Sequence, residues 1–287
     1  MRFAAAVLCW LITTIALAVA IPAAWTQLNI VDEDGYAALA QRAAADPTLQ
    51  SAMAGELTTR AMALIIEHGG GRYPINSSVV HNAAAAFTAG PAFPQLFAQL
   101  NRAVHGYVFS DPASVRDGDQ WLVDLAPMLK DPTIQRMLSS YHVTVPATLR
   151  VPVTATVSQP MRQGQLRRLA VWGPGVTIGA VAVSAVGGLL TLLIARGRGR
   201  ALTSLGVSVL LVGAVGWAGL ETVWRYINAA LNQTTGDIRR VADVMVSYAE
   251  RGLHVWLNLA LVAGAALVVL GVLAAVGGSV VKRPAQP

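Results

Sequence analysis

The residues whose types and spacing could do chemistry are Asn101, His105 and Asp124. Asn101 and His105 are four positions apart, a spacing that places both on one face of a helix. A histidine oriented by a carboxylate, here His105 by Asp124, can act as a general base. The same pair can equally be a half-buried histidine that hydrogen-bonds a carboxylate for structural reasons. Because no nucleophile, metal ligands or phosphate loop accompany the pair, the sequence favours the structural interpretation and leaves these residues as weak catalytic candidates.

Motifs that identify an enzyme or a cofactor site are missing from the sequence. It contains no G-x-x-x-x-G-K-[ST], no G-x-S-x-G and no H-E-x-x-H. The single cysteine, Cys9, excludes a disulfide within the chain. The other histidines share no metal-ligand spacing with His105; they are His68, His81, His142 and His254. We therefore expect no cofactor and no metal site, and we favour a chain that is not an enzyme.

The elements that position these residues belong to a membrane protein. Of the 287 residues, 54% are hydrophobic and 13% are charged, whereas soluble domains average about 25% charged residues. Four apolar runs are long enough to cross a hydrocarbon layer of ~30 Å. The expected spans are 1–24, 170–195, 201–220 and 255–281. We favour an uncleaved anchor over a cleaved signal peptide for the first run, because its apolar core exceeds the usual 7–15 residues.

The charges are distributed unequally among the segments that join these spans. Residues 25–169 hold 11 basic and 11 acidic groups, and residues 221–254 hold four of each. The whole net charge of +6 falls on residue 2, the turn 196–200 and the tail 282–287, and is carried by Arg2, Arg196, Arg198, Arg200, Lys282 and Arg283. Positively charged segments stay in the cytoplasm. We therefore expect a multi-pass protein of the bacterial plasma membrane with both termini and the turn inside, and with 25–169 and 221–254 outside.

Four tryptophans agree with this topology. Each lies near the expected outer end of a different span, where indole rings prefer the membrane interface; they are Trp25, Trp172, Trp224 and Trp256. Because topology accounts for the arginines, we expect the lipid bilayer as a partner and no nucleic acid. Binding of anionic lipid by the inner arginines stays open.

The segment 25–169 is expected to be a helix-rich α+β domain. Asp46-Pro47 and Asp131-Pro132 predict helix starts, since aspartate caps a helix and proline suits its first position. One apolar stripe follows the first of these starts and comprises Leu49, Met53, Leu57, Ala61, Leu64 and Ile65. From Val143 to Ser158 apolar and polar residues alternate, which predicts an edge strand. The expected fold class is thus a mainly α membrane protein with four transmembrane helices plus an α+β extracytoplasmic domain.

Three further patterns concern packing. In 221–254, Ile238, Val241, Met245 and Tyr248 share one helix face, for which we favour packing on the outer domain over a place on the lipid surface. Gly175 and Gly179 form a G-x-x-x-G pattern that permits close approach of two spans. Asn258, the amide within the last span, is expected to form a hydrogen bond between helices rather than to bind an ion.

Two stretches of the sequence carry a family resemblance. The first is Phe93-x-x-x-Phe97-x-x-x-Asn101-Arg102-x-x-His105 with Val123-Asp124-Leu125-x-Pro127, and the second is Val31-Asp32-Glu33-Asp34-Gly35-Tyr36 leading to Asp46-Pro47-Thr48-Leu49-Gln50. With the order of parts, they resemble uncharacterised actinobacterial four-span membrane proteins that have an extracytoplasmic domain between the first and second spans. Phe97 departs from that pattern, in which tryptophan is expected. The resemblance implies this organisation and a Gram-positive, high-GC host, and it implies no reaction.

Three functions remain open from the sequence. The leading hypothesis is a non-enzymatic envelope protein whose outer domain binds a protein or cell-envelope partner, because that domain is neutral and lacks a catalytic signature. The second is an extracytoplasmic enzyme that uses His105 and Asp124. The third, a small-solute transporter or channel, is disfavoured because no ionisable residue lies deep within a span.

Overall fold

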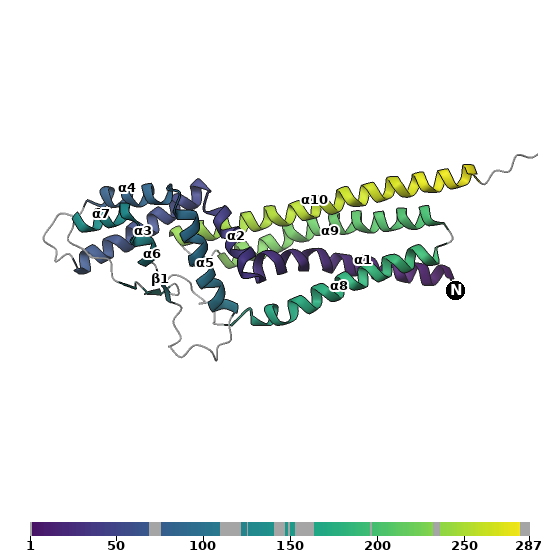
Figure 1. The fold of residues 1–287 in the computed structure, drawn as a ribbon, viewed down its shortest axis with the longest axis horizontal. Coiled ribbons are helices and arrows are strands. Elements are labelled where there is room, and N and C mark those ends of the chain that lie inside the picture. The colour runs from purple at the N-terminus through teal and green to yellow at the C-terminus, as the bar shows by residue number, and fades with distance from the viewer. Residues whose placement is uncertain are drawn as a thin grey trace, which may run out of the picture. The chain divides into compact units, whose positions relative to one another are not determined.

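The computed structural model describes residues 2–68, 76–109, 122–124, 126–140, 147–148, 150–152, 164–195, 197–231 and 236–281. Helices dominate these residues (Figure 1). In chain order the elements are α1 (Arg2–Thr26), the π-helix η1 (Gln27–Val31), α2 (Glu33–Ala43), α3 (Pro47–His68), α4 (Ser77–Thr88), α5 (Phe93–Phe109), β1 (Leu122–Asp124), α6 (Ala126–Leu129), α7 (Pro132–Ser140), β2 (Arg150–Pro152), α8 (Arg167–Ile194), α9 (Arg198–Leu231) and α10 (Gly236–Val281).

The chain divides into two compact units. Unit 1 consists of Met1–Leu28, Leu169–Arg225 and Glu250–Pro287, and unit 2 consists of Asn29–Arg168 and Tyr226–Ala249. These limits are close to the expected outer segments 25–169 and 221–254. Helices α9 and α10 each contribute residues to both units.

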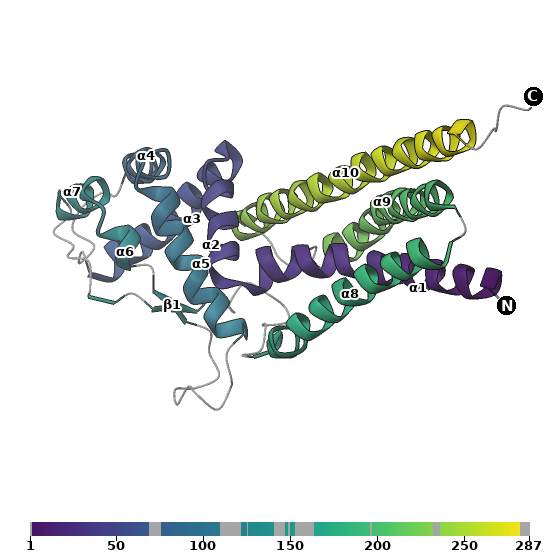
Figure 2. The same cartoon turned by 45° about the vertical axis from the view of Figure 1, so that its right-hand side comes forward.

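Unit 1 contains most of each helix of membrane length. Among the described residues, four helices are long and apolar enough to cross a bilayer, with candidate spans Ala4–Val31, Arg167–Ile194, Arg198–Ala229 and Gly236–Val276. Figures 1 and 2 show α1, α8, α9 and the C-terminal part of α10 side by side. The start of α1, the C-terminal end of α8, the start of α9 and the C-terminal end of α10 lie at the same end of the unit. Large apolar side chains point outward along these helices, and Trp172 is 71% exposed. An apolar surface of this extent suits hydrocarbon rather than water.

Helices α9 and α10 touch backbone to backbone through glycines. Gly199 and Gly206 of α9 are seven residues apart, as are Gly264 and Gly271 of α10, so each pair lies on one helix face. A Cβ at Gly206 would lie 2.7 Å from Val268 N and 2.8 Å from Gly264 O. We call the contact made by these four residues the glycine contact. Small residues permit this close approach where lipid supplies no hydrophobic drive for association.

The close approach that the G-x-x-x-G pattern permits at Gly175 and Gly179 does not occur among the described residues. A Cβ at either position would meet nothing within 4 Å in the part of the chain that the structure describes. Gly187, further along α8, is the position where α1 approaches, and a Cβ there would overlap Thr13 Oγ1.

Polar side chains inside unit 1 join helices to one another or to their own backbone. Trp10 Nε1 donates to Ser204 O at 3.0 Å, and Thr14 Oγ1 donates to Ser208 Oγ at 2.8 Å, which ties α1 to α9. Trp217 Nε1 of α9 donates to Asn258 Oδ1 of α10 at 3.2 Å. The role predicted for Asn258, a hydrogen bond between helices, is therefore confirmed.

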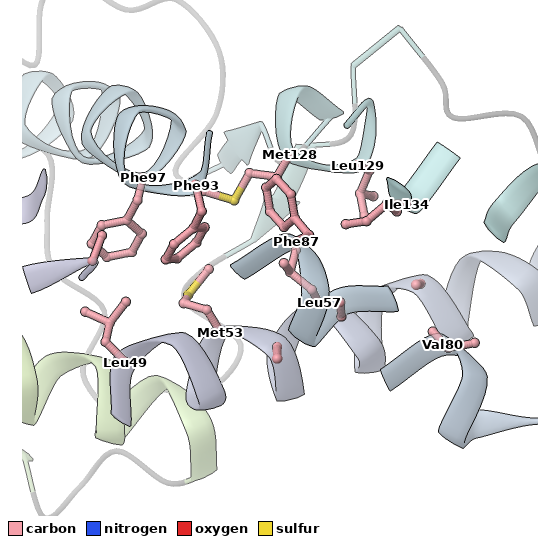
Figure 3. Packing of buried hydrophobic residues seen from close by; sticks show 14 of the residues in the cluster. Leu49, Met53, Leu57, Val80, Phe87, Phe93, Phe97, Met128, Leu129 and Ile134 are labelled. Carbon is pink, nitrogen blue, oxygen red and sulfur yellow. The ribbon is translucent and has the colours of Figure 1, made fainter. Parts of the chain in front are cut away.

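The core of unit 2 is apolar and is built by α2 to α7 with the N-terminal part of α10. Figure 3 shows Phe87, Phe93 and Phe97 among the core side chains, and their rings lie 5.6–5.7 Å apart in edge-on and tilted pairs. The predicted α3 stripe is confirmed, because all six of its residues are buried. The packing of the 221–254 helix is also confirmed, since Val241, Met245 and Tyr248 contact this core. Ile238 is not among the core residues.

The two predicted helix starts are confirmed. Helix α3 begins at Pro47, and the Asp46 carboxylate accepts from Thr48 N at 2.9 Å. Helix α7 begins at Pro132, directly after Asp131. At α3 the carboxylate takes up a free amide, and at both starts the proline ring presets the helical φ.

The expected α+β class is wrong, because the described residues of unit 2 are overwhelmingly helical. Strand structure among them is limited to β1 and β2, an antiparallel pair three residues long in which Val123 faces Val151. A ladder of this length cannot form a layer of a domain. Most of the alternating segment 143–158 lies outside the described residues, and β2 is the described part of it that is extended. The fold class is therefore mainly α, with four helices of membrane length.

Candidate functional site

His105 lies in the interior of unit 2, on α5. Its side chain is 6% exposed. The ring stacks on Phe109, with centroids 4.3 Å apart, and tilts against Tyr36 at 5.5 Å. Its Nε2 lies 3.1 Å from the carbonyl oxygen of Ile30. Because a carbonyl oxygen can only accept, Nε2 carries the proton and donates it.

The bond to Ile30 has a local cause. Ile30 belongs to η1, which ends at Val31, and α2 begins only two residues later. Carbonyls in the last turn of a helix lack partners in their own helix. Gly35 lies five residues after Ile30, the spacing of a π-helix hydrogen bond. Its amide donates to the Asp32 carboxylate at 2.8 Å rather than to the Ile30 carbonyl. His105 thus supplies a donor to the end of η1, and one of its two ring nitrogens is used in that contact.

Asn101 shares the buried face of α5 with His105, as their spacing predicts, and is 8% exposed. Its Nδ2 donates to Phe97 O at 2.8 Å, one turn earlier in the same helix. The amide therefore satisfies the backbone of its own helix. Asn101 and His105, the catalytic candidates of α5, thus both donate to main-chain carbonyls.

Asp124 ends β1, where its backbone pairs with Arg150. Helix α5 contacts β1, so the strand lies next to the helix that carries His105. The Asp124 side chain is outside the described part of the structure, and the predicted orientation of His105 by this carboxylate stays a prediction.

Burial also affects Tyr36, which covers one side of the His105 ring. Desolvation raises the pKa of the Tyr36 hydroxyl above its ordinary value. The neutral phenol is therefore the form that the folded state favours. Tyr36 therefore packs against the His105 ring as a neutral phenol.

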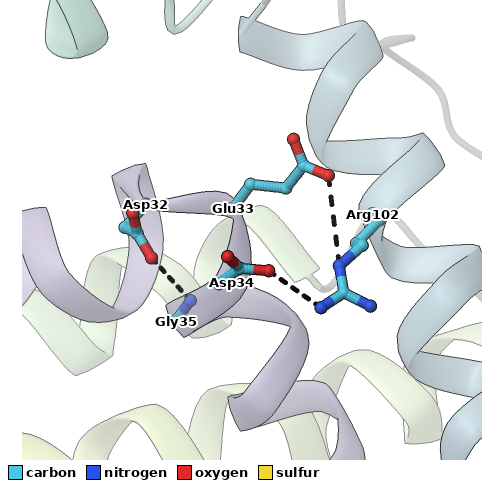
Figure 4. A network of polar contacts seen from close by, with 5 residues as sticks. All are labelled: Asp32, Glu33, Asp34, Gly35 and Arg102. Carbon is cyan, nitrogen blue, oxygen red and sulfur yellow. Dashed lines mark hydrogen bonds and ion pairs between the residues drawn. The ribbon is translucent and has the colours of Figure 1, made fainter.

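The ion cluster that links α2 to α5 was missed from the sequence (Figure 4). Arg102 donates to Asp34 Oδ1 at 2.9 Å, and its Nε lies 4.0 Å from Glu33 Oε1. All three side chains are exposed. The signal was present, because Arg102 and the acidic run both belong to the stretches that carry the family resemblance. The fold brings these two stretches together, and the contacts they make hold α2 on α5.

The other histidines and the free cysteine do not form a metal site in the described structure. No group of three or more His, Cys, Asp or Glu side chains that could hold a metal ion is present among the described residues. His81 Nδ1 lies 3.3 Å from Thr58 Oγ1, and the His254 ring stacks on Trp217 with centroids 3.8 Å apart. His68 and His142 have no described side chain.

The predicted topology residues are described only in part. Arg198 and Arg200 are exposed at the start of α9. The side chains of Arg2, Arg196, Lys282 and Arg283 lie outside the described structure. Among the predicted anchors Trp172 is exposed, and Trp224 and Trp256 are half-buried. Trp25 is buried next to Gly252 of α10, so its indole packs inside unit 1.

Comparison of the chain with protein-family models, with curated proteins and with solved structures found no match.

Proposed function

We propose that this chain is a multi-pass plasma-membrane protein of an actinobacterium, with both termini in the cytoplasm, whose unit 2 binds a protein or envelope component on the outer face without catalysing a reaction. The orientation is supported by the six uncompensated cations, because positive segments stay in the cytoplasm. The described ends of unit 1 agree, since the start of α1, the end of α8, the start of α9 and the end of α10 lie together.

The observation that carries the binding proposal is the contrast between the interior and the surface of unit 2. His105 and Asn101 are buried and bind backbone carbonyls. Ile66 and Val79, in contrast, are 63% and 45% exposed. Ile66 lies near the end of α3 and Val79 near the start of α4, and these helices pack on each other. We call this apolar pair the α3–α4 tip.

The α3–α4 tip is the part of unit 2 that suits a partner. Most other large apolar side chains in the described residues of the unit are buried or half-buried, and Tyr226 is the further exposed one. Covering an exposed apolar side chain removes it from water, and this favours the complex with a partner. A partner that covers Ile66 and Val79 would remove both from water.

The orientation can be tested with single cysteines, because Cys9 is the only cysteine to remove. In a Cys9→Ser background, Thr59→Cys places a thiol on the exposed face of α3, and Arg198→Cys places one at the start of α9. A membrane-impermeant maleimide added to whole cells should label the first and should label the second only after lysis. The reverse pattern would overturn the proposed topology.

Partner binding can be tested by crosslinking on whole cells. A photo-crosslinking residue at position 79 should give a defined adduct, and Ile66→Lys should abolish it. Thr59→Lys is the matched control, because it adds the same charge at another exposed site of α3 and should leave the adduct intact. No adduct at position 79, or an adduct insensitive to Ile66→Lys, would contradict the proposal.

A further inference from the structure

A pocket of about 560 Å³ lies inside unit 1, where α1 meets the end of α8 and the start of α9. Its lining includes Val7 and Trp10 of α1, Thr191 and Ile194 of α8, and Arg200 and Ser204 of α9. We call it the turn pocket. Val7 and Arg200 are exposed, so the pocket opens to the surroundings of the helices. Its volume falls in the range of about 300–1,000 Å³ that is usual for small-molecule sites.

The interior of the turn pocket offers hydrocarbon rather than free hydrogen-bond donors. Thr191 Oγ1 donates to Gly187 O, and Ser204 Oγ donates to Ala201 O, each at 2.8 Å. Trp10 Nε1 donates to Ser204 O at 3.0 Å. With these donors used within the protein, the lining side chains other than Arg200 offer mainly alkyl and aromatic surface. An apolar occupant therefore suits the interior, because a polar one would lose its hydrogen bonds to water.

Arg200 gives the turn pocket one cationic side, and no acidic side chain pairs with it among the described residues. The sequence has no acidic residue before Asp32, between Asp131 and Glu221, or after Glu250. Within the described residues the Arg200 guanidinium forms no ion pair. A guanidinium at a membrane surface binds phosphate oxygens well, since it can donate two parallel hydrogen bonds.

We propose that the turn pocket holds one anionic phospholipid, with an acyl chain in the apolar interior and the headgroup phosphate on Arg200. A lipid fits because it joins hydrocarbon to an anion, as the pocket joins an apolar interior to a cation. A free phosphate would leave the interior empty, and a neutral hydrocarbon would leave Arg200 without a counter-charge. The assignment does not depend on which side of the membrane the turn occupies.

Trp10 allows the site to be observed directly. The full chain in mild-detergent micelles would be titrated with phosphatidylglycerol brominated on its acyl chains, and with brominated phosphatidylcholine of the same chains. Subtracting the signal of the Trp10→Phe variant assigns the quenching to Trp10. We expect half-maximal quenching at an about tenfold lower concentration of the anionic lipid, the change expected for a charge-assisted hydrogen bond.

Two arginine variants separate a site from general surface charge. Arg200→Gln should remove the preference for the anionic lipid, whereas Arg198→Gln, which makes the same charge change on an exposed neighbour outside the pocket, should retain it. Ala195→Phe fills the pocket and should abolish quenching by both lipids. Equal losses in the two arginine variants, quenching that persists in Ala195→Phe, or displacement of the lipid by inorganic phosphate would overturn the proposal.

Discussion

Replacement of Gly206 by alanine tests the glycine contact between α9 and α10. A Cβ there would lie 2.7 Å from Val268 N and 2.8 Å from Gly264 O. Non-bonded heavy atoms prefer separations of about 3.5–4.0 Å, so the two helices would have to move apart by roughly 1 Å. The atoms in the way belong to the backbone and cannot rotate aside as a side chain can. The whole contact would therefore open rather than a single neighbour.

The cost follows from two opposing terms. Overpacking typically costs about 1–3 kcal/mol, and a gap of about 1 Å also forfeits up to about half of each dispersion contact along the interface. Alanine recovers up to about 1 kcal/mol of helix propensity relative to glycine. Gly219→Ala, on the same helix, gains that propensity but meets nothing within 4 Å among the described residues. The difference between the two variants isolates the clash, and we expect Gly206→Ala to be less stable by about 1–3 kcal/mol.

The assay is unfolding of the full chain in mild-detergent micelles by titration with a denaturing detergent, followed by circular dichroism. A double variant adds a second check. A Cβ at Gly264 would lie 2.9 Å from Leu210 N, in the same contact. Gly264→Ala should therefore lower the stability less in the Gly206→Ala background, where the helices are already separated, than in the parent chain. Equal stability of Gly206→Ala and Gly219→Ala, or full additivity of the two costs, would refute the close packing described here.

Three further predictions concern unit 2. His105→Ala removes the donor to Ile30 O and should lower the stability of the unit by about 1–3 kcal/mol, measured as a lower thermal midpoint; a midpoint unchanged from the parent would contradict its structural role. Arg102→Ala removes an exposed pair with Asp34 and should cost at most about 1 kcal/mol, with a loss that shrinks in high salt; a loss of several kcal/mol would show that the pair is not a surface contact. Because burial raises the pKa of Tyr36, the stability this ring contributes should be fully present below about pH 10 and decrease above it. Tyr36→Phe should flatten that decrease in pH-dependent unfolding, and an unchanged slope would refute the assignment.

Much of the fold could be predicted because it depends on local spacing. The α3 stripe repeats at three and four residues, and burial of one helix face explains it without knowledge of the neighbour. Asp46-Pro47 and Asp131-Pro132 fix helix starts through bonds and dihedrals within a few residues. The apolar face of Val241, Met245 and Tyr248 likewise predicts that something covers it, and the core of unit 2 does.

The α+β prediction failed because a sheet depends on pairing between distant segments, which local spacing does not show. Period-two alternation over 143–158 shows that two sets of side chains differ in polarity, but it does not supply a partner strand. The described pairing of β1 with β2 comprises three residues of each strand. An α+β domain needs several paired strands, and alternation in one segment does not predict them.

Glycine spacing illustrates what a single sequence leaves undetermined about packing. Gly175 and Gly179 have the spacing usually associated with close helices, yet a Cβ at either would meet nothing within 4 Å among the described residues, while glycines seven residues apart on α9 and α10 meet. Either spacing places small residues on one face. Which face has a neighbour depends on how four helices are arranged, and that is decided by contacts spread over the whole unit, such as Thr14 with Ser208.

The candidate site differs from its sequence interpretation because the partner of His105 is a main-chain atom. A carbonyl such as that of Ile30 occurs at every position, so no pattern of residue types predicts that it will lie 75 residues away in sequence from a histidine and need a donor. The side-chain types limit which bonds His105 and Asn101 can form, and the packing of α5 beside the end of η1 decides which ones they do form. Those bonds engage one ring nitrogen of His105 and the amide nitrogen of Asn101, so both side chains stabilise the backbone around them. The surface of the unit, where Ile66 and Val79 stay exposed, is therefore where its interaction with other molecules is to be sought.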